Sequence, residues 1–116
     1  MQNYGASAAF IIGDEIEWEF VGDKVKRKIL GFDASLMLVN VHFEKGGIGA
    51  LHEHYHSQVS YVESGVFEVT IGGEVKTLKA GDSFYVAPHV LHGAVCIETG
   101  ILIDIFSPIR EDFVKN

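Results

Sequence analysis

Several features that mark large classes of protein are scarce in this sequence. It contains one cysteine, Cys96, so no disulfide can form within the chain, which fits a reducing compartment. Its amino-terminal apolar run, residues 8–12, is too short to cross a bilayer, and no Lys or Arg precedes it as in a signal peptide. We therefore expect a cytoplasmic protein with no membrane partner.

Basic residues are also few. The chain has 9 Lys and Arg against 16 Asp and Glu, a formal net charge of −7 at pH 7. Proteins that bind nucleic acids concentrate basic residues on one face. The one basic cluster here, Lys24, Lys26, Arg27 and Lys28, has instead the alternation of a solvated strand face. Nucleic acid is therefore not an expected partner, and an anionic ligand requires a local positive group.

Only 2 prolines occur, and no segment has the apolar period of a long helix. With 116 residues, 47% of them apolar and 22% charged, the chain has the length and composition of one globular domain. We expect a single domain over residues 1–116, with an amino-terminal arm over about 1–12 and a carboxyl-terminal tail over 107–116. The 13 glycines separate short apolar runs, which indicates an all-β sandwich or barrel.

The apolar runs predict the strands. Alternation over residues 15–20 predicts a half-buried strand, and Leu36–Phe43, apolar on both parities, predicts a central strand covered on both faces. Gly72 and Gly73 predict a two-residue hairpin. Further strands are expected over residues 58–63, 66–71, 83–86, from 92 onward and over 100–106, with one helical turn over 110–115.

Histidines cluster in two stretches. Alternate side chains of a strand share a face, so His52 and His54 project to the same side, about 7 Å apart along the chain, close enough to bind one cation. Gln58 follows a short connection and offers an amide oxygen, and His92 can reach the same ion from another strand. This donor set suits one divalent transition metal ion, namely zinc, nickel, iron, manganese or cobalt, with open positions for water or substrate.

Three other candidates are interpreted as structural. His42 lies on an apolar strand, and His56 lies in the connection between ligands, where it supports a ligand or faces solvent. Because no base for Cys96 is identifiable, we expect that thiol to serve packing.

The spacing of these residues resembles the two sequence motifs of the cupins. The matching residues are Gly46, His52, His54, Gln58 and Gly65 in the first motif and Gly81, Asp82, Pro88 and His92 in the second. The resemblance implies a cupin double-stranded β-helix, a jelly-roll barrel. The sequence departs from the pattern at Ala87, His89 and Cys96, and Gln58 replaces the usual glutamate. Removing that negative charge makes a bound ion the stronger Lewis acid.

A charged residue lies among apolar ones near the carboxyl terminus. Asp104 shares one strand face with Leu102 and Phe106, which makes it a candidate general acid or base if that face lines the barrel. Arg110 has the planar fork that grips a carboxylate. The alternative is an ion pair between Asp104 and Arg110 at the rim, with Phe106 as ordinary core.

Five stretches, residues 26–30, 43–46, 52–65, 81–93 and 104–113, resemble the KdgF-type proteins of pectin degradation. The resemblance implies a metal-containing cupin that converts unsaturated uronate monomers, released by pectate or alginate lyases, into their linear keto forms. It also implies that Asp104, Phe106 and Arg110 occupy the substrate site, with Asp104 moving a proton, Arg110 holding the substrate carboxylate and Phe106 packing against the sugar.

Two other functions stay open. A metal cupin with three histidines can also be a dioxygenase, or it can bind metal or sugar without catalysis. Because several strands have two apolar faces and isologous dimers are the commonest oligomers, we expect a homodimer formed by sheet-to-sheet contact.

Overall fold

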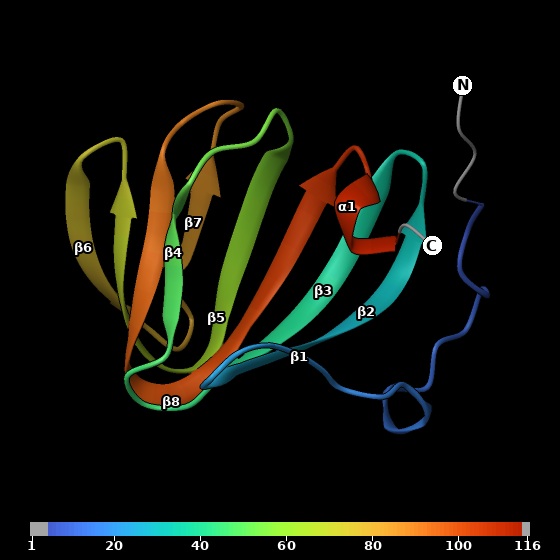
Figure 1. Ribbon diagram of the computed structural model, residues 1–116, viewed down its shortest axis with the longest axis horizontal. Coiled ribbons are helices and arrows are strands. Elements are labelled where there is room, and N and C mark those ends of the chain that lie inside the picture. Colours follow the sequence, from blue (N-terminus) through green and yellow to red (C-terminus); the bar gives the residue numbers. More distant parts are fainter. Residues whose placement is uncertain (1–4, 115–116) are drawn as a thin grey trace.

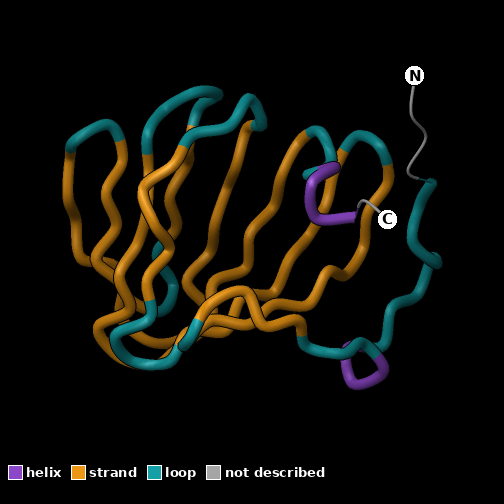
Figure 2. Tube along the Cα trace, in the orientation of Figure 1, coloured by secondary structure: helices purple, strands orange, loops and turns teal. Residues whose placement is uncertain are grey.

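The computed structural model describes residues 5–114, and antiparallel β-sheet makes up most of them (Figure 1). The strands are β1 (Glu19–Gly22), β2 (Val25–Asp33), β3 (Leu36–Phe43), β4 (Ile48–His52), β5 (Ser57–Ile71), β6 (Glu74–Lys79), β7 (Ser83–Val86) and β8 (His92–Ser107). Figure 2 shows the two short helical turns, η1 (Gly13–Glu15) and α1 (Glu111–Val114). Neither is long and apolar enough to cross a membrane.

Two long strands hold the fold together. The strand order is β1-β2-β3-β8-β5-β6, while β4 pairs with β8 and β7 pairs with β5. Thus β8 pairs with β3 along one half and with β4 along the other, and β5 divides in the same way between β7 and β6. The sheet curves around a common interior, with β6 and β2 at opposite ends of the view in Figure 1. The all-β jelly-roll prediction is therefore confirmed.

Both long strands bend where two glycines meet. The register between β5 and β8 shifts around Ser64, and Gly65 has a φ of 83°. A Cβ on Gly65 would lie 2.5 Å from the Glu98 carbonyl oxygen, and one on Gly100 would lie 2.0 Å from that of Ser64. The break predicted between residues 63 and 66 is therefore a bulge inside one strand, because pairing with β8 resumes on both sides.

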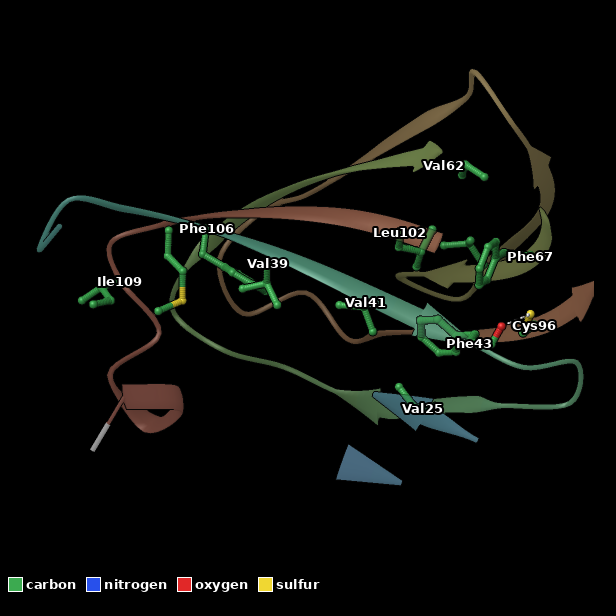
Figure 3. Close-up of a cluster of buried hydrophobic side chains, with 12 residues drawn as sticks. Val25, Val39, Val41, Phe43, Val62, Phe67, Cys96, Leu102, Phe106 and Ile109 are labelled. Carbon is green, nitrogen blue, oxygen red and sulfur yellow. Dashed lines mark hydrogen bonds between the residues drawn. The ribbon is translucent and has the colours of Figure 1, made fainter. Parts of the chain in front are cut away.

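The central position predicted for Leu36–Phe43 is confirmed, since β3 lies between β2 and β8. The prediction that both of its faces are covered is confirmed for one face and holds only in part for the other. The face that carries Met37, Val39, Val41 and Phe43 is buried. On the other face Leu38, Asn40 and His42 are half-buried, and Leu36 is 51% exposed. The buried face joins the core drawn in Figure 3, where Phe43 packs edge-to-face on Phe67 of β5 with ring centroids 5.2 Å apart.

The strand predicted over residues 15–20 is wrong for most of its length. A helical turn ends at Glu15, β1 begins only at Glu19, and Phe20 is 75% exposed. The aromatic residues meet cations instead of the core: the ammonium groups of Lys26 and Lys28 each lie 4.6 Å from the Trp18 ring centroid.

The predicted hairpin and carboxyl-terminal turn are confirmed. Gly72 and Gly73 have φ values of 55° and 85°, and Ile71 pairs with Glu74 across them. One turn of helix covers Glu111–Val114, while the last residue of its predicted range, Lys115, lies outside the described residues. The tail returns to the barrel through Ile109, which is 3% exposed and belongs to the core cluster.

Candidate metal centre

The sheet brings the three predicted histidine ligands together. His52 ends β4 and pairs directly with His92, which begins β8, and their ring centroids are 4.4 Å apart. His54, in the loop after β4, has its centroid 4.7 Å from that of His92 and 5.4 Å from that of His52. One nitrogen from each ring lies within 4.8 Å of the others, so this group could hold a metal ion.

The backbone orients all three rings. In each ring Nδ1 lies near the carbonyl oxygen of a residue two positions away: 2.8 Å for His52 and Ala50, 3.1 Å for His54 and His56, and 2.9 Å for His92 and Val90. Because a carbonyl oxygen can only accept a hydrogen bond, Nδ1 carries the proton. The Nε2 atoms of the neutral rings are therefore lone-pair donors, as metal binding requires.

Two histidine nitrogen atoms in the site have no hydrogen-bond donor facing them. His92 Nε2 is buried and has no hydrogen-bond partner among the described residues. His54 Nε2 lies 3.0 Å from Oε1 of Gln58, at the start of β5, so in the neutral ring two lone pairs face each other. A buried polar atom without a partner costs about 1–3 kcal/mol. A cation bound by these atoms would remove that cost at His92 and the repulsion between the lone pairs of His54 and Gln58. The donor set thus fits a divalent transition metal ion.

Burial also favours the neutral rings. It lowers the pKa of His92 to about 4 and holds the pKa of His54 below its usual value, although the contact with Gln58 acts in the opposite direction for His54. Both rings are therefore neutral near pH 7, with Nε2 free to bind an ion.

A cavity of about 370 Å³ lies beside this cluster. Its walls include His52, Gln58 and His92 together with all three predicted substrate-site residues, Asp104, Phe106 and Arg110. The volume is within the range of small-molecule sites. The structure therefore brings every sequence-predicted site residue to one region. His54 does not line the cavity, but its ring contacts those of His92 and Phe106, which do.

Asp104 is placed to exchange a proton near neutral pH. Burial raises the pKa of its carboxyl to about 6, although a hydrogen bond from Ser60 and the charge of Arg110 oppose that rise. The Ser60 hydroxyl lies 2.6 Å from Asp104 Oδ1. Asp104 lines the cavity, which meets the condition under which the sequence made it a candidate general acid or base.

The alternative of an Asp104–Arg110 ion pair is wrong. Arg110 donates from Nε and Nη2 to the two carboxylate oxygens of Asp112, at 3.0 and 2.8 Å. Its guanidinium also stacks on Phe113, 4.2 Å from the ring centroid, and lies 5.1 Å from that of Phe106. Arg110 is thus held as a positive group at the cavity wall, and its remaining N–H groups are available to an anion. Phe106 is both core and cavity wall, with 3% of its surface exposed.

Sequence reasoning missed the residues that support the site. Ser60 is fully buried; its strand parity, two residues after Gln58, is the signal that could have found it. Nothing in the sequence marks Asp112 as the partner of Arg110. His56 is 2% exposed and does not face solvent: its Nε2 donates to the Ile109 carbonyl oxygen at 3.1 Å.

The fold and this site define the class of protein. Residues 39–106 match the family model described as the cupin domain, so the chain belongs to the cupin family. Within it, the chain belongs with the KdgF proteins. It is 49% identical over 107 residues to the pectin degradation protein KdgF of Dickeya dadantii (strain 3937), covering 90% of this chain and 97% of that protein.

Two solved structures are similar along nearly the whole chain. The KdgF structure from Halomonas sp. is 40% identical, with a TM-score of 0.88 over 92% of this chain and 99% of that one. An RmlC-like cupin from Shewanella frigidimarina NCIMB 400 is 55% identical, with a TM-score of 0.92 over 94% of this chain and 98% of that one.

Proposed function

We propose that this cupin acts in pectin or alginate degradation and opens the ring of unsaturated uronate monomers to give the linear keto form. The observation that carries the proposal is one cavity wall that brings together two of the three imidazoles that could hold a metal ion, a carboxyl group with a pKa of about 6 and the guanidinium of Arg110. The similarity to a pectin degradation protein supports the choice of substrate. The proposal includes the cytoplasmic location expected from the sequence.

The reaction needs acid–base catalysis and no oxidant. A 4,5-unsaturated uronic acid in its ring form is both an enol ether and a hemiacetal. Loss of the anomeric hydroxyl proton forms the aldehyde at carbon 1 as the bond from carbon 1 to the ring oxygen breaks. The released electron pair stays on that oxygen as an enolate. Proton uptake at carbon 4 then gives the ketone at carbon 5, so atoms and electrons balance as an isomerisation.

His52, His54, Gln58 and His92 would hold one divalent transition metal ion: zinc, nickel, iron, manganese or cobalt. When bound, the ion supplies Lewis-acid stabilisation of negative charge on substrate oxygen. Gln58 contributes a neutral ligand, so the protein neutralises little of that ion's charge.

The cavity residues divide the remaining work. Asp104 moves the proton, either from the anomeric hydroxyl or to carbon 4, and a pKa near 6 suits both directions at neutral pH. Arg110 binds the substrate carboxylate and supplies the local positive charge that a chain of net charge −7 needs for an anionic substrate. Phe106 packs against the sugar ring.

The test mixes the metal-loaded protein with a lyase digest of pectin or alginate and follows the conjugated ultraviolet absorbance and dissolved oxygen together. Loss of absorbance without oxygen uptake is the expected result. Oxygen uptake identifies a dioxygenase instead, and a stable ligand complex without turnover identifies a binding module. Asp104→Asn with normal metal content should abolish the absorbance change, so a fully active variant contradicts the role given to Asp104.

The proposed assembly is a homodimer formed through the outer face of the sheet. On this face Tyr61, Val59 and Tyr85 are 47%, 45% and 59% exposed, and Ile105 is 42% exposed beside Val59. The solvent face of an antiparallel sheet is ordinarily polar. Although Glu63 follows on the same exposed parity of β5, these four neighbouring apolar side chains form a patch that suits a second copy of the same chain.

A further inference from the structure

We propose that Ser60 is a positioning residue which, held by the amide N–H of Gln58, keeps the transferable proton of Asp104 on its cavity-facing oxygen, Oδ2. The inference rests on the proposed function only in giving that proton a catalytic use. The hydrogen-bond arrangement itself follows from the geometry.

Three side chains form a continuous polar row across β5 and β8. Gln58 and Ser60 lie on the same face of β5, and Ser60 pairs directly with Asp104 of β8. Gln58 Nε2 lies 2.9 Å from Ser60 Oγ, which lies 2.6 Å from Asp104 Oδ1. Ser60 has none of its surface exposed, so no bulk water competes for its hydroxyl.

The chemistry of the three groups fixes the direction of the row. An amide nitrogen has no lone pair to offer, so Gln58 donates to Ser60 Oγ. A hydroxyl has one proton, and among the residues that the structure describes the other hydrogen-bond partner of Ser60 Oγ is Asp104 Oδ1. The hydroxyl proton therefore points at Oδ1, which accepts the hydrogen bond. A proton on Oδ1 directed at Ser60 Oγ would collide with the hydroxyl proton.

The other carboxyl oxygen of Asp104, Oδ2, is available to take up a proton. Within residues 5–114, Oδ2 makes no hydrogen bond. It is not among the buried polar atoms without a partner, so solvent reaches it. Asp104 itself lines the cavity. When the carboxyl group takes up a proton, that proton therefore resides on Oδ2 and faces the substrate.

The same row explains why an amide suits position 58. Gln58 presents Oε1 toward His54 and Nε2–H toward Ser60, so one side chain serves both the metal cluster and Asp104. A glutamate at this position would have only acceptor oxygens in its ionised form. It would then compete with Asp104 for the single hydroxyl proton, and the fixed direction of the row would be lost.

The experiment follows the Asp104 carboxyl by carbon-13 NMR titration in the metal-free full-length protein, comparing wild type with Ser60→Ala and Ser60→Thr. A hydrogen bond donated to the ionised form lowers a pKa, so removing the hydroxyl should raise the Asp104 midpoint by about one unit. Ser60→Thr should restore the wild-type midpoint. Ser64→Ala, on the same strand but outside the row, is the matched control and should leave it unchanged.

The direction of the shift decides the matter. A lower midpoint in Ser60→Ala would show that the hydroxyl accepts from a protonated Asp104, and no shift would show that the row has no influence; either overturns the proposal. If Ser60→Ala does not fold, Ser60→Cys, a weak donor of similar size, should raise the midpoint in its place. The other charged or titratable groups that line this cavity are Arg27 of β2, Arg110 of the tail, His52 and His92, and they are the same in all variants.

Turnover of the lyase product provides an independent readout. Ser60→Ala should lower kcat by about 10- to 100-fold, with KM nearly unchanged, and Ser60→Thr should recover most of it. If the titration shifts as expected but no protein consumes the lyase product, the proposed function fails and the polar row stands. If the wild type turns over and the titration does not shift, only this inference fails.

Discussion

At the residue scale, the site depends on which atoms carry protons. Backbone carbonyl oxygens hold the Nδ1 protons of three histidines and so direct three Nε2 lone pairs to one place. Spacing in the sequence predicts that these residues are near one another. It does not predict their tautomers, because the carbonyl groups that fix them belong to the turns around the ligands and their orientation depends on the fold.

His92 is expected to be required for metal binding. Within the described part of the chain its Nε2 is buried without a hydrogen-bond partner, so a bound ion supplies the interaction that this atom lacks, and the substitution removes one ligand. His92→Ala should lower metal affinity by at least about 100-fold in a competition titration with a chromophoric chelator. His42→Ala, outside the cluster, should bind as wild type does; equal affinity of the two variants would remove His92 from the ligand set.

Asp104→Asn is expected to stabilise the metal-free protein near neutral pH. The pKa of Asp104 is about 6 in the fold, above its usual value of 3.8, so its ionisation opposes folding as the pH rises between those values. The variant should gain roughly 1–2 kcal/mol over wild type at pH 7 and little at pH 4 in urea unfolding. A gain at pH 4 as large as that at pH 7 contradicts a raised pKa.

At the element scale, β5 and β8 determine where the site lies. Each strand is bent near its middle, and the bend lets one strand contribute both to the sheet half that carries Asp104 and to the half that carries His92. The apolar runs predicted most of these strands, but they divided β5 and β8 into shorter pieces. A bulge and a strand end both appear in the sequence as a break in the apolar pattern near a glycine. Only the pairing with a distant strand distinguishes them.

The contact between the bends makes Gly100 intolerant of a side chain. An added Cβ would lie 2.0 Å from the Ser64 carbonyl oxygen and 2.5 Å from Gly65 Cα, both backbone atoms. Gly100→Ala should therefore cost roughly 3 kcal/mol or lead to misfolding, measured by thermal and urea unfolding. Gly13→Ala, where nothing lies within 4 Å of the added Cβ, should change stability little. Equal stability of the two variants would contradict the close approach of β5 and β8.

At the scale of the whole molecule, the family motifs carried more of the prediction than local patterns did. The resemblance placed His92 and Asp104 with the first histidine pair, although they are far from it in the chain. The residues that it did not place, Ser60 and Asp112, support the site through contacts made only after the sheet and tail have packed. The strand at residues 15–20 was mispredicted because alternation identifies an amphipathic face but not whether core or lysine side chains cover it.

The outer sheet face provides a further prediction at this scale. Tyr61→Glu places a charge within the exposed apolar patch, where it would be buried in the proposed interface. Light scattering after size exclusion should show a dimer for wild type and a monomer for this variant. Val75→Glu, on an exposed apolar residue of β6, should remain dimeric. A monomeric wild type would contradict the proposed assembly.

The most direct test of the account is a crystal structure of metal-loaded protein with anomalous diffraction measured at the absorption edge of the ion supplied. One anomalous peak should lie about 2.0–2.3 Å from Nε2 of His52, His54 and His92 and from Oε1 of Gln58. Absence of a peak there in fully loaded crystals, or a peak only at the other group of potential ligands, His56, Glu111 and Asp112, would contradict it.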